Sequence, residues 1–250
     1  MKALITGASS GIGRDMAIYL SNLGHDLIIV ARDKDRLIEL KKILKTNVEV
    51  IDLDLSEEKA CHKLYDKVKK EKIDILINNA GFGVHGNFYE TDLNREIEMI
   101  NLNIKTVHIL TKLFLKDMKE RNSGYILNVA SSAAFAPGPL MATYYATKAY
   151  VLRLTESIYG ELKKENINVC ISALCPGPVD TNFNSVAKVK FSIKGISSKY
   201  VAKYGIDNMF KGKLVIVPSF KIKMARIFSS ILPLKWVISF AYNNQKKKVS

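Results

Sequence analysis

Tyr144 and Lys148 form the pair of side chains in this sequence best suited to moving a proton. They are four positions apart, so on a helix they lie on one face, one turn from each other. A free phenol has a pKa of about 10 and is a poor acid–base catalyst at neutral pH. A lysine ammonium group one turn away stabilises the phenolate and lowers that pKa. The pair therefore predicts a proton-transfer site centred on Tyr144.

The glycine-rich residues 6–13, with the sequence TGASSGIG, indicate a second kind of chemistry. They follow a short apolar run at residues 3–5 and open a segment, residues 12–23, whose apolar side chains recur at helical spacing. A glycine-rich turn between a strand and a helix lets the backbone approach a pyrophosphate and directs the helix N-terminus at its charge. We therefore expect a dinucleotide-binding loop here.

An alternation of apolar strands and amphipathic helices surrounds these residues. Continuous apolar runs predict strands at residues 3–5, 27–30, 48–51, 73–77, 125–130, 168–174 and 214–217. Helical spacing predicts helices between them, including residues 12–23, 92–121 and 144–164. Buried strands separated by helices indicate a parallel sheet covered on both faces. We therefore predict one α/β domain over residues 1–250, a doubly wound parallel sheet of about seven strands.

Three motifs in this order resemble the short-chain dehydrogenase/reductase superfamily. They are the glycine segment at residues 6–13, the sequence NNAG at residues 78–81, and Tyr144-x-x-x-Lys148. The likeness runs from residue 2 to about residue 181 and includes Pro176, Gly177 and Thr181. Together, in this order and spacing, the motifs are highly specific. The resemblance implies a Rossmann-type domain that reduces a carbonyl, or oxidises the matching alcohol, by hydride transfer from nicotinamide C4.

The resemblance also implies a role for each catalytic residue. Ser131, 13 residues before Tyr144, matches the family serine that hydrogen-bonds the substrate carbonyl oxygen, and Ser132 is the neighbouring alternative. Tyr144 matches the proton donor. Lys148 matches the residue that tunes this tyrosine and holds the cofactor ribose. Tyr145 does not fit the family spacing and is interpreted as a packing residue.

An asparagine completes this set. Asn103 matches the family residue that holds a water linked to the lysine, which provides a proton route to solvent. Asn101 competes for the same role, and counting back from Thr111 favours Asn103. No metal is needed for this chemistry, and the four histidines have no ligand spacing.

The residues at the end of the second predicted strand indicate whether the cofactor is NADP(H) or NAD. In NAD enzymes of the family an acid there binds the ribose hydroxyls, whereas here the aligned residue is Ala31, followed by Arg32. A guanidinium binds a 2′-phosphate bidentately, and a carboxylate repels it. Lys34 and Arg36 add positive charge nearby, while Asp33 lies about where an acid in an NAD site could fall. We expect Asp33 to point outward and the cofactor to be NADP(H), with NAD less favoured.

The rest of the cofactor site follows from the same resemblance. Asp54 matches the residue that hydrogen-bonds the adenine amino group, and Asn79 and Gly81 match the motif that braces the central strand. The implied cofactor contacts are Gly7, Ser9, Ser10, Gly11, Ile12, Gly13, Arg32, Asp54, Leu55, Asn79, Ala80, Gly81, Tyr144, Lys148, Pro176, Gly177, Val179 and Thr181.

Composition restricts the remaining choices. With 250 residues, 48% of them hydrophobic, the chain is neither disordered nor a low-complexity repeat. Its three cysteines are too few and too scattered for a disulfide framework or a zinc site, which indicates a reducing compartment. Residues 1–5 lead directly into the first predicted strand, so we expect no signal peptide. The longest apolar stretch, residues 227–242, is interrupted by Pro233 and Lys235. We therefore expect a cytoplasmic protein.

The positive charge is concentrated at the C-terminal end. Residues 188–250 contain 14 basic residues and one acid, Asp207, out of a net charge of +14 for the whole chain. Such an excess attracts anionic partners, but no nucleic-acid motif accompanies it, and none is expected to bind. Within residues 182–250 we expect a substrate lid, the last strand and a basic amphipathic tail. Apolar lid residues would suit a hydrophobic or acyl-type substrate: Phe183, Val189, Phe191 and Ile193.

The tail itself, residues 219–248, combines an apolar stripe with lysines, Arg226 and Trp236. This pattern suits a segment that lies peripherally on an anionic membrane, such as the inner membrane surface. Equally, the stripe could pack on a sister subunit or close the pocket, and the family resemblance implies a homodimer or homotetramer. A dinucleotide-binding regulatory or scaffold protein without turnover is the alternative to an enzyme.

Overall fold

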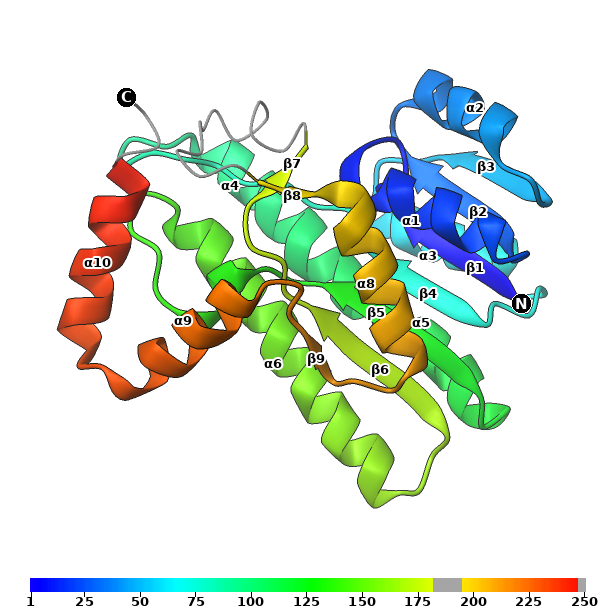
Figure 1. Ribbon diagram of the computed structural model, residues 1–250. Helices are drawn as coiled ribbons and strands as arrows, with labels where there is room; N and C mark the ends of the chain where they lie inside the picture. Colours follow the sequence, from blue (N-terminus) through cyan, green and yellow to red (C-terminus); the bar gives the residue numbers. More distant parts are fainter. Residues whose placement is uncertain (182–194, 247–250) are drawn as a thin grey trace.

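A seven-stranded parallel sheet forms the centre of the computed structural model, which describes residues 1–181 and 195–246 (Figure 1). Its strand order is β3-β2-β1-β4-β5-β6-β9. The strands are β1 (Lys2–Thr6), β2 (Asp26–Ala31), β3 (Val48–Asp52), β4 (Ile75–Asn78), β5 (Gly124–Val129), β6 (Val169–Leu174) and β9 (Val215–Ile216). Each overlaps a strand predicted from an apolar run. The Rossmann-type doubly wound sheet is therefore confirmed.

Helices cover both faces of this sheet (Figure 1). One face is covered by α1 (Gly11–Asn22), α2 (Lys34–Ile43) and α8 (Ser198–Phe210). The other is covered by α3 (Glu58–Val68), α4 (Leu93–Ile100), α5 (Val107–Glu120) and α6 (Ala142–Lys164). In β1, Leu4 packs into one layer while Ala3 and Ile5 pack into the other. Alternate side chains thus enter two cores, which explains why the strands are apolar throughout.

Three features differ from the sequence prediction. The helix expected at residues 92–121 is interrupted by a π-helical segment, Asn101–Thr106, between α4 and α5. Helix α8 was not predicted, because Gly205 and Asn208 in its interior weaken the helical signal. The short pairing of β7 (Val179–Asp180) with β8 (Ile196–Ser197) is too brief to give a sequence pattern.

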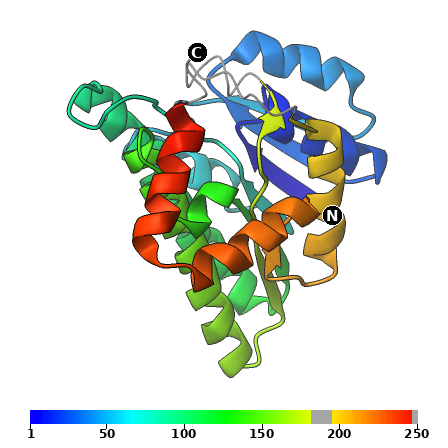
Figure 2. The same cartoon turned by 60° about the vertical axis from the view of Figure 1, so that its left-hand side comes forward.

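The last two helices, α9 (Phe220–Ile231) and α10 (Leu234–Lys246), lie on the outside of the molecule, away from α2 (Figures 1 and 2). They form in the segment predicted to be an amphipathic tail and are separated near Pro233. In residues 1–181 and 195–246, no helix combines the length and apolarity needed to cross a membrane. The predicted lid residues Phe183, Val189, Phe191 and Ile193 lie outside the described residues.

Candidate active site

A cavity of about 440 Å³ opens at the carboxyl ends of the strands. From β1 the successive strands β2 and β3 are added on one side, and the strands from β4 onward are added on the other side. Ligands bind at this switch point in doubly wound folds. Of the predicted catalytic and cofactor-binding residues, all line this cavity except Gly13 and Asn103, which lie behind its wall. Residues from distant parts of the chain therefore meet in one place, because consecutive strands all end at this edge.

The glycine loop is shaped by close contacts between backbone segments. Gly7 has a φ of +66°, and a Cβ there would lie 2.8 Å from the Cα of Ala80. At Gly13 a Cβ would lie 2.4 Å from the Gly7 carbonyl oxygen and from Asn79 Nδ2. Asn79 Nδ2 donates to the carbonyl oxygens of Thr6 (3.0 Å) and Gly7 (3.1 Å) and so clamps the loop. Because the loop has few side chains and leads directly into the N-terminus of α1, its backbone N–H groups can approach the pyrophosphate of a dinucleotide.

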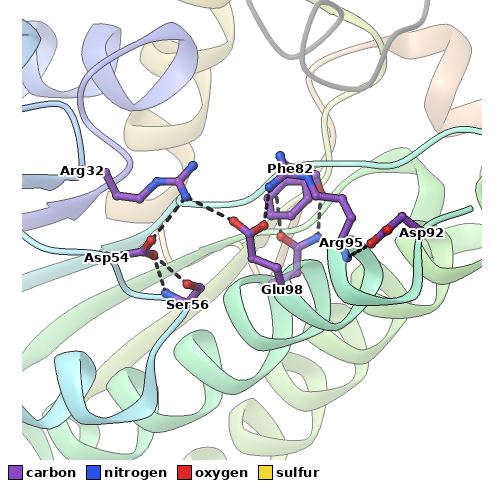
Figure 3. A network of polar contacts seen from close by, with 8 residues as sticks. Arg32, Asp54, Ser56, Phe82, Asp92, Arg95 and Glu98 are labelled. Atoms are coloured by element: carbon purple, nitrogen blue, oxygen red, sulfur yellow. Dashed lines mark hydrogen bonds and ion pairs between the residues drawn. The ribbon is translucent and has the colours of Figure 1, made fainter.

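Arg32 lies between two carboxylates at the other end of the cavity (Figure 3). Its Nη1 is 3.3 Å from Asp54 Oδ2 and 3.1 Å from Glu98 Oε1. Burial disfavours the charge of Asp54, but hydrogen bonds from Ser56 and the Arg32 charge outweigh it and lower the pKa of Asp54. Arg32 and Asp54, which were predicted separately as cofactor contacts, thus contact each other, and Glu98 is an addition that no sequence motif marked.

Asp33 has a structural role at the N-terminus of α2. Its Oδ1 accepts the backbone N–H of Arg36 at 3.1 Å, and its Oδ2 lies 3.2 Å from Arg36 Nε. Both residues line the cavity, so the carboxylate stands at its edge. Because α2 and Arg36 already engage this carboxylate, Asp33 is less available to bind ribose hydroxyls than a free acid would be.

Ser131, Tyr144 and Lys148 meet at the end of β5 and the start of α6. Tyr144 is 9% exposed and Lys148 5%, so both are buried from water. Ser131 hydrogen-bonds the Tyr144 hydroxyl. The Lys148 ammonium lies 5.9 Å from the centre of the Tyr144 ring and donates to the Val129 carbonyl oxygen at 2.9 Å. The structure therefore brings together the three side chains that the family motif predicts.

The pKa values of this group differ from the sequence prediction. Burial raises the pKa of Tyr144 to about 12, and the hydrogen bond from Ser131 offsets this only in part. Burial also lowers the pKa of Lys148 to about 8. The protein groups alone do not lower the pKa of this tyrosine, because desolvation of the phenolate dominates; the lowering was expected from Lys148 together with the positive nicotinamide ring of the oxidised complex. A phenol with a raised pKa remains protonated at neutral pH and can act as a proton donor.

Asn103 lies in the π-helical segment and is fully buried. Its Oδ1 accepts the backbone N–H of Phe82 at 3.1 Å, and its Nδ2 donates to the Phe82 carbonyl oxygen at 2.9 Å and to Thr147 Oγ1 at 3.1 Å. A Cβ on Gly81 would lie 2.7 Å from Asn103 Oδ1 and 3.5 Å from Lys148 Nζ. Asn103 therefore stands close to Lys148, with Gly81 between them.

The alternatives from the sequence have other contacts. The Tyr145 hydroxyl accepts a hydrogen bond from Gln245 of α10. Ser132 begins the 3-10 helix Ser132–Phe135 and donates its backbone N–H to the Pro176 carbonyl oxygen. Asn101 accepts, through its carbonyl oxygen, the hydroxyl of Thr106. Ser132 and Tyr145 line the cavity as well, so the catalytic roles of Ser131, Tyr144 and Asn103 stay a prediction.

Several residues of the cavity were missed because they belong to no motif. Near the catalytic group the wall is largely apolar, formed by Phe82, Ala133, Met141 and Tyr145. The guanidinium of Arg95 lies 3.9 Å above the Phe82 ring and pairs with Glu98 (Figure 3). The periodicity of the 92–121 helix marks its buried face, but nothing in it indicates which polar residue turns toward the cavity.

Comparisons with known proteins agree with this geometry. The sequence profile of the family described as short chain dehydrogenase matches residues 1–190. An uncharacterized oxidoreductase of Staphylococcus saprophyticus is 35% identical over 185 residues, which cover 72% of this chain and 78% of that protein. The human very-long-chain 3-oxoacyl-CoA reductase is 31% identical over 194 residues, which cover 74% of this chain and 62% of the human protein.

Solved structures show the same fold. A short-chain dehydrogenase from Sphingobium yanoikuyae in complex with NADPH matches with a TM-score of 0.82 and 28% identity, covering 93% of this chain and 96% of that one. One from Burkholderia phymatum in complex with NAD matches with a TM-score of 0.83 and 25% identity, covering 90% and 91%. Because the family profile covers most of the sequence, the chain belongs to the short-chain dehydrogenase/reductase family of oxidoreductases.

Proposed function

We propose that this protein reduces a carbonyl group on a hydrophobic or acyl-type substrate with NADPH. The observation that carries the proposal is the buried Ser131–Tyr144–Lys148 group, which shares one cavity with the glycine loop. Burying a tyrosine hydroxyl and a lysine ammonium lowers the free energy of unfolding. A dinucleotide-binding regulator without turnover would not need these groups, so their burial supports an enzyme.

Each residue of the group contributes a separate part of the chemistry. When bound, the reduced nicotinamide supplies the hydride. Ser131 hydrogen-bonds the carbonyl oxygen, and Tyr144 donates the proton to that oxygen as negative charge develops on it. Lys148 stabilises the phenolate that remains on Tyr144 after the proton is donated. Asn103 would hold a water beside Lys148, through which Tyr144 is reprotonated from solvent. The raised pKa of Tyr144 favours reduction, since the protonated phenol is the form that reduction needs.

The residues at both ends of the cavity fit a dinucleotide. Gly7, Gly11 and the N-terminus of α1 would hold the pyrophosphate, and Asp54 the adenine. Arg32 would hold a 2′-phosphate, and the aligned acid of NAD enzymes is replaced by Ala31. We therefore propose NADP(H) over NAD; the similar solved structures include one bound to NADPH and one bound to NAD.

The substrate proposal depends on the apolar wall beside the catalytic group. Ala133, Met141 and Tyr145 offer contacts to a hydrocarbon chain. The similarity to very-long-chain 3-oxoacyl-CoA reductases supports the same class of substrate.

A substrate screen tests the proposed function. The purified protein would be assayed with 3-oxoacyl thioesters and ketones of increasing chain length, using NADPH and NADH in parallel. We expect consumption of NADPH that rises with chain length and exceeds consumption of NADH. Tight binding of NADPH without consumption by any carbonyl compound would favour the regulatory alternative.

We also propose a cytoplasmic homo-oligomer that contacts anionic membranes through α9 and α10. Half of the large apolar side chains exposed among the described residues belong to this segment: Phe220, Ile227, Phe228, Ile231, Leu232, Leu234, Trp236, Ile238, Phe240 and Tyr242. Residues 220–246 contain five basic residues and no acid. Exposed apolar side chains among lysines suit the interface of an anionic bilayer, where each basic residue contributes about 1 kcal/mol.

A further inference from the structure

Every guanidinium that lines the cavity among the described residues is already paired with a carboxylate. Arg32 contacts Asp54 and Glu98, Arg36 contacts Asp33 at 3.2 Å, and Arg95 contacts Glu98. Asp54 and Glu98 both contact Nη1 of Arg32, so a 2′-phosphate that binds this guanidinium must either share it with these acids or displace one of them. Glu98 holds two of the three arginines and is the acid shared between them.

Glu98 differs from Asp54 in its other contacts. Asp54 Oδ1 accepts two hydrogen bonds from Ser56, at 3.0 Å to the backbone N–H and 2.8 Å to the hydroxyl, which fix it in the loop after β3. Glu98 lies in α4, one turn before Leu102 of the cavity wall, and its carboxylate reaches across to Arg32 at the end of β2 (Figure 3). Its contacts are thus to the arginines, and it forms no part of the predicted set of cofactor contacts.

We propose that Glu98 sets how strongly the protein distinguishes NADPH from NADH, by competing with the 2′-phosphate for Arg32. The inference rests on the proposed preference for NADP(H). A phosphate carries more negative charge than a carboxylate and can bind the guanidinium bidentately, so it competes with Glu98 for Arg32. The repulsion between Glu98 and the phosphate, and the cost of any exchange at Arg32, fall on NADPH alone, because NADH has an uncharged hydroxyl at this position.

Direct binding measurements on Glu98→Gln test this role. Dissociation constants for NADPH and NADH would be measured by calorimetry at fixed ionic strength, without substrate. Arg32 is 54% exposed, so we expect a gain in NADPH affinity of about two- to fivefold and no change for NADH. Glu120→Gln, which makes the same charge change at the exposed end of α5, should alter neither constant. An unchanged or weakened affinity of Glu98→Gln for NADPH would overturn the inference.

Repeating the Glu98→Gln measurement in a protein that also carries Arg32→Gln shows whether Glu98 acts through Arg32. If Glu98 acts through Arg32, Glu98→Gln does not increase the affinity for NADPH when Arg32 is already replaced. If Glu98→Gln increases NADPH affinity equally in the wild type and in Arg32→Gln, competition for this arginine is contradicted. The proposed function is judged separately by the wild-type protein: a wild type that binds NADH more tightly than NADPH contradicts the cofactor preference, whatever Glu98 does.

Discussion

At the level of single residues, burial has opposite effects on the pKa values of Tyr144 and Lys148: it raises the first and lowers the second. Tyr144 and Lys148 could be assigned from the sequence, because a helix places residues four apart on one face. The direction of their pKa shifts could not, since it depends on the loss of water around both groups. Ser131 and Asn103 were likewise predicted from motif spacing, whereas Glu98 and Arg95 are recognised only when α4 is placed against the end of β2.

The pH dependence of carbonyl reduction follows from Lys148. Its pKa of about 8 means that the ammonium is charged below this pH and neutral above it, while Tyr144, with a pKa of about 12, stays protonated throughout. We expect kcat/KM for reduction to be constant from pH 6 to about 7 and to fall above about pH 8, because the phenolate loses its stabilising charge. A rate profile between pH 6 and 10 measures this.

Lys148→Arg provides the control, since a guanidinium keeps its charge over this range. The decline above pH 8 should be absent from whatever activity the variant retains. A wild-type rate that increases with pH would contradict the assignment of the titration to Lys148.

At the level of elements, the apolar runs and helical periods were sufficient to predict the parallel sheet and most of its helices. What they could not reveal is the π-helical segment Asn101–Thr106, because an extra residue in one turn leaves no mark on the sequence. That turn nevertheless brings Asn103 into contact with the backbone of Phe82. The glycine loop, in contrast, was predictable because Gly7 and Gly13 lie against backbone atoms that leave no room for a side chain.

Gly13→Ala tests the packing of the loop against α1. The added Cβ would lie 2.4 Å from the Gly7 carbonyl oxygen, so the loop must shift. We expect a loss of about 1–3 kcal/mol in the free energy of unfolding and a loss of NADPH binding. Urea denaturation and a binding titration measure the two effects.

Gly160→Ala in α6 is the matched substitution, because nothing lies within 4 Å of a Cβ at that position. It should stabilise the protein by about 0.5–1 kcal/mol through helix propensity and leave binding unchanged. Equal stabilities for the two variants would show that the loop does not depend on close backbone contact.

At the level of the whole molecule, α9 and α10 lie at the edge of the fold, where Ile222 of α9 packs against a small core cluster. Apart from Val237 and Gln245, their side chains are exposed or half-buried. The sequence predicted an apolar stripe with positive charge, but the stripe alone could not distinguish a membrane surface from a sister subunit. Their contacts with the body include Arg226, which lies 3.9 Å from Glu156 and 5.1 Å from the centre of the Phe135 ring. In addition, Gln245 donates to Tyr145 at the cavity wall.

Membrane contact is measured by co-sedimentation with phosphatidylglycerol vesicles. We expect the protein to bind at low salt and to be released at high salt, because the attraction is largely electrostatic. Replacing both Trp236 and Phe240, 67% and 73% exposed, by Gln should weaken binding at least about tenfold through lost apolar burial.

Phe88→Gln, at a residue 67% exposed elsewhere on the surface, should leave vesicle binding unchanged. No binding at low salt would contradict the membrane proposal. If the double substitution instead dissociates an oligomer and leaves vesicle binding intact, α9 and α10 form a subunit interface.

The central claim is that Tyr144 donates the proton in an NADPH-dependent carbonyl reduction. It is tested most directly by the rate of NADPH oxidation with a long-chain 3-oxoacyl thioester, compared among wild type, Tyr144→Phe and Tyr145→Phe. We expect Tyr144→Phe to lose about 10²–10⁴-fold in kcat while its NADPH affinity stays within a few-fold, since only a proton donor is removed. Tyr145→Phe should retain most of the wild-type kcat. An active Tyr144→Phe beside an inactive Tyr145→Phe would contradict the account.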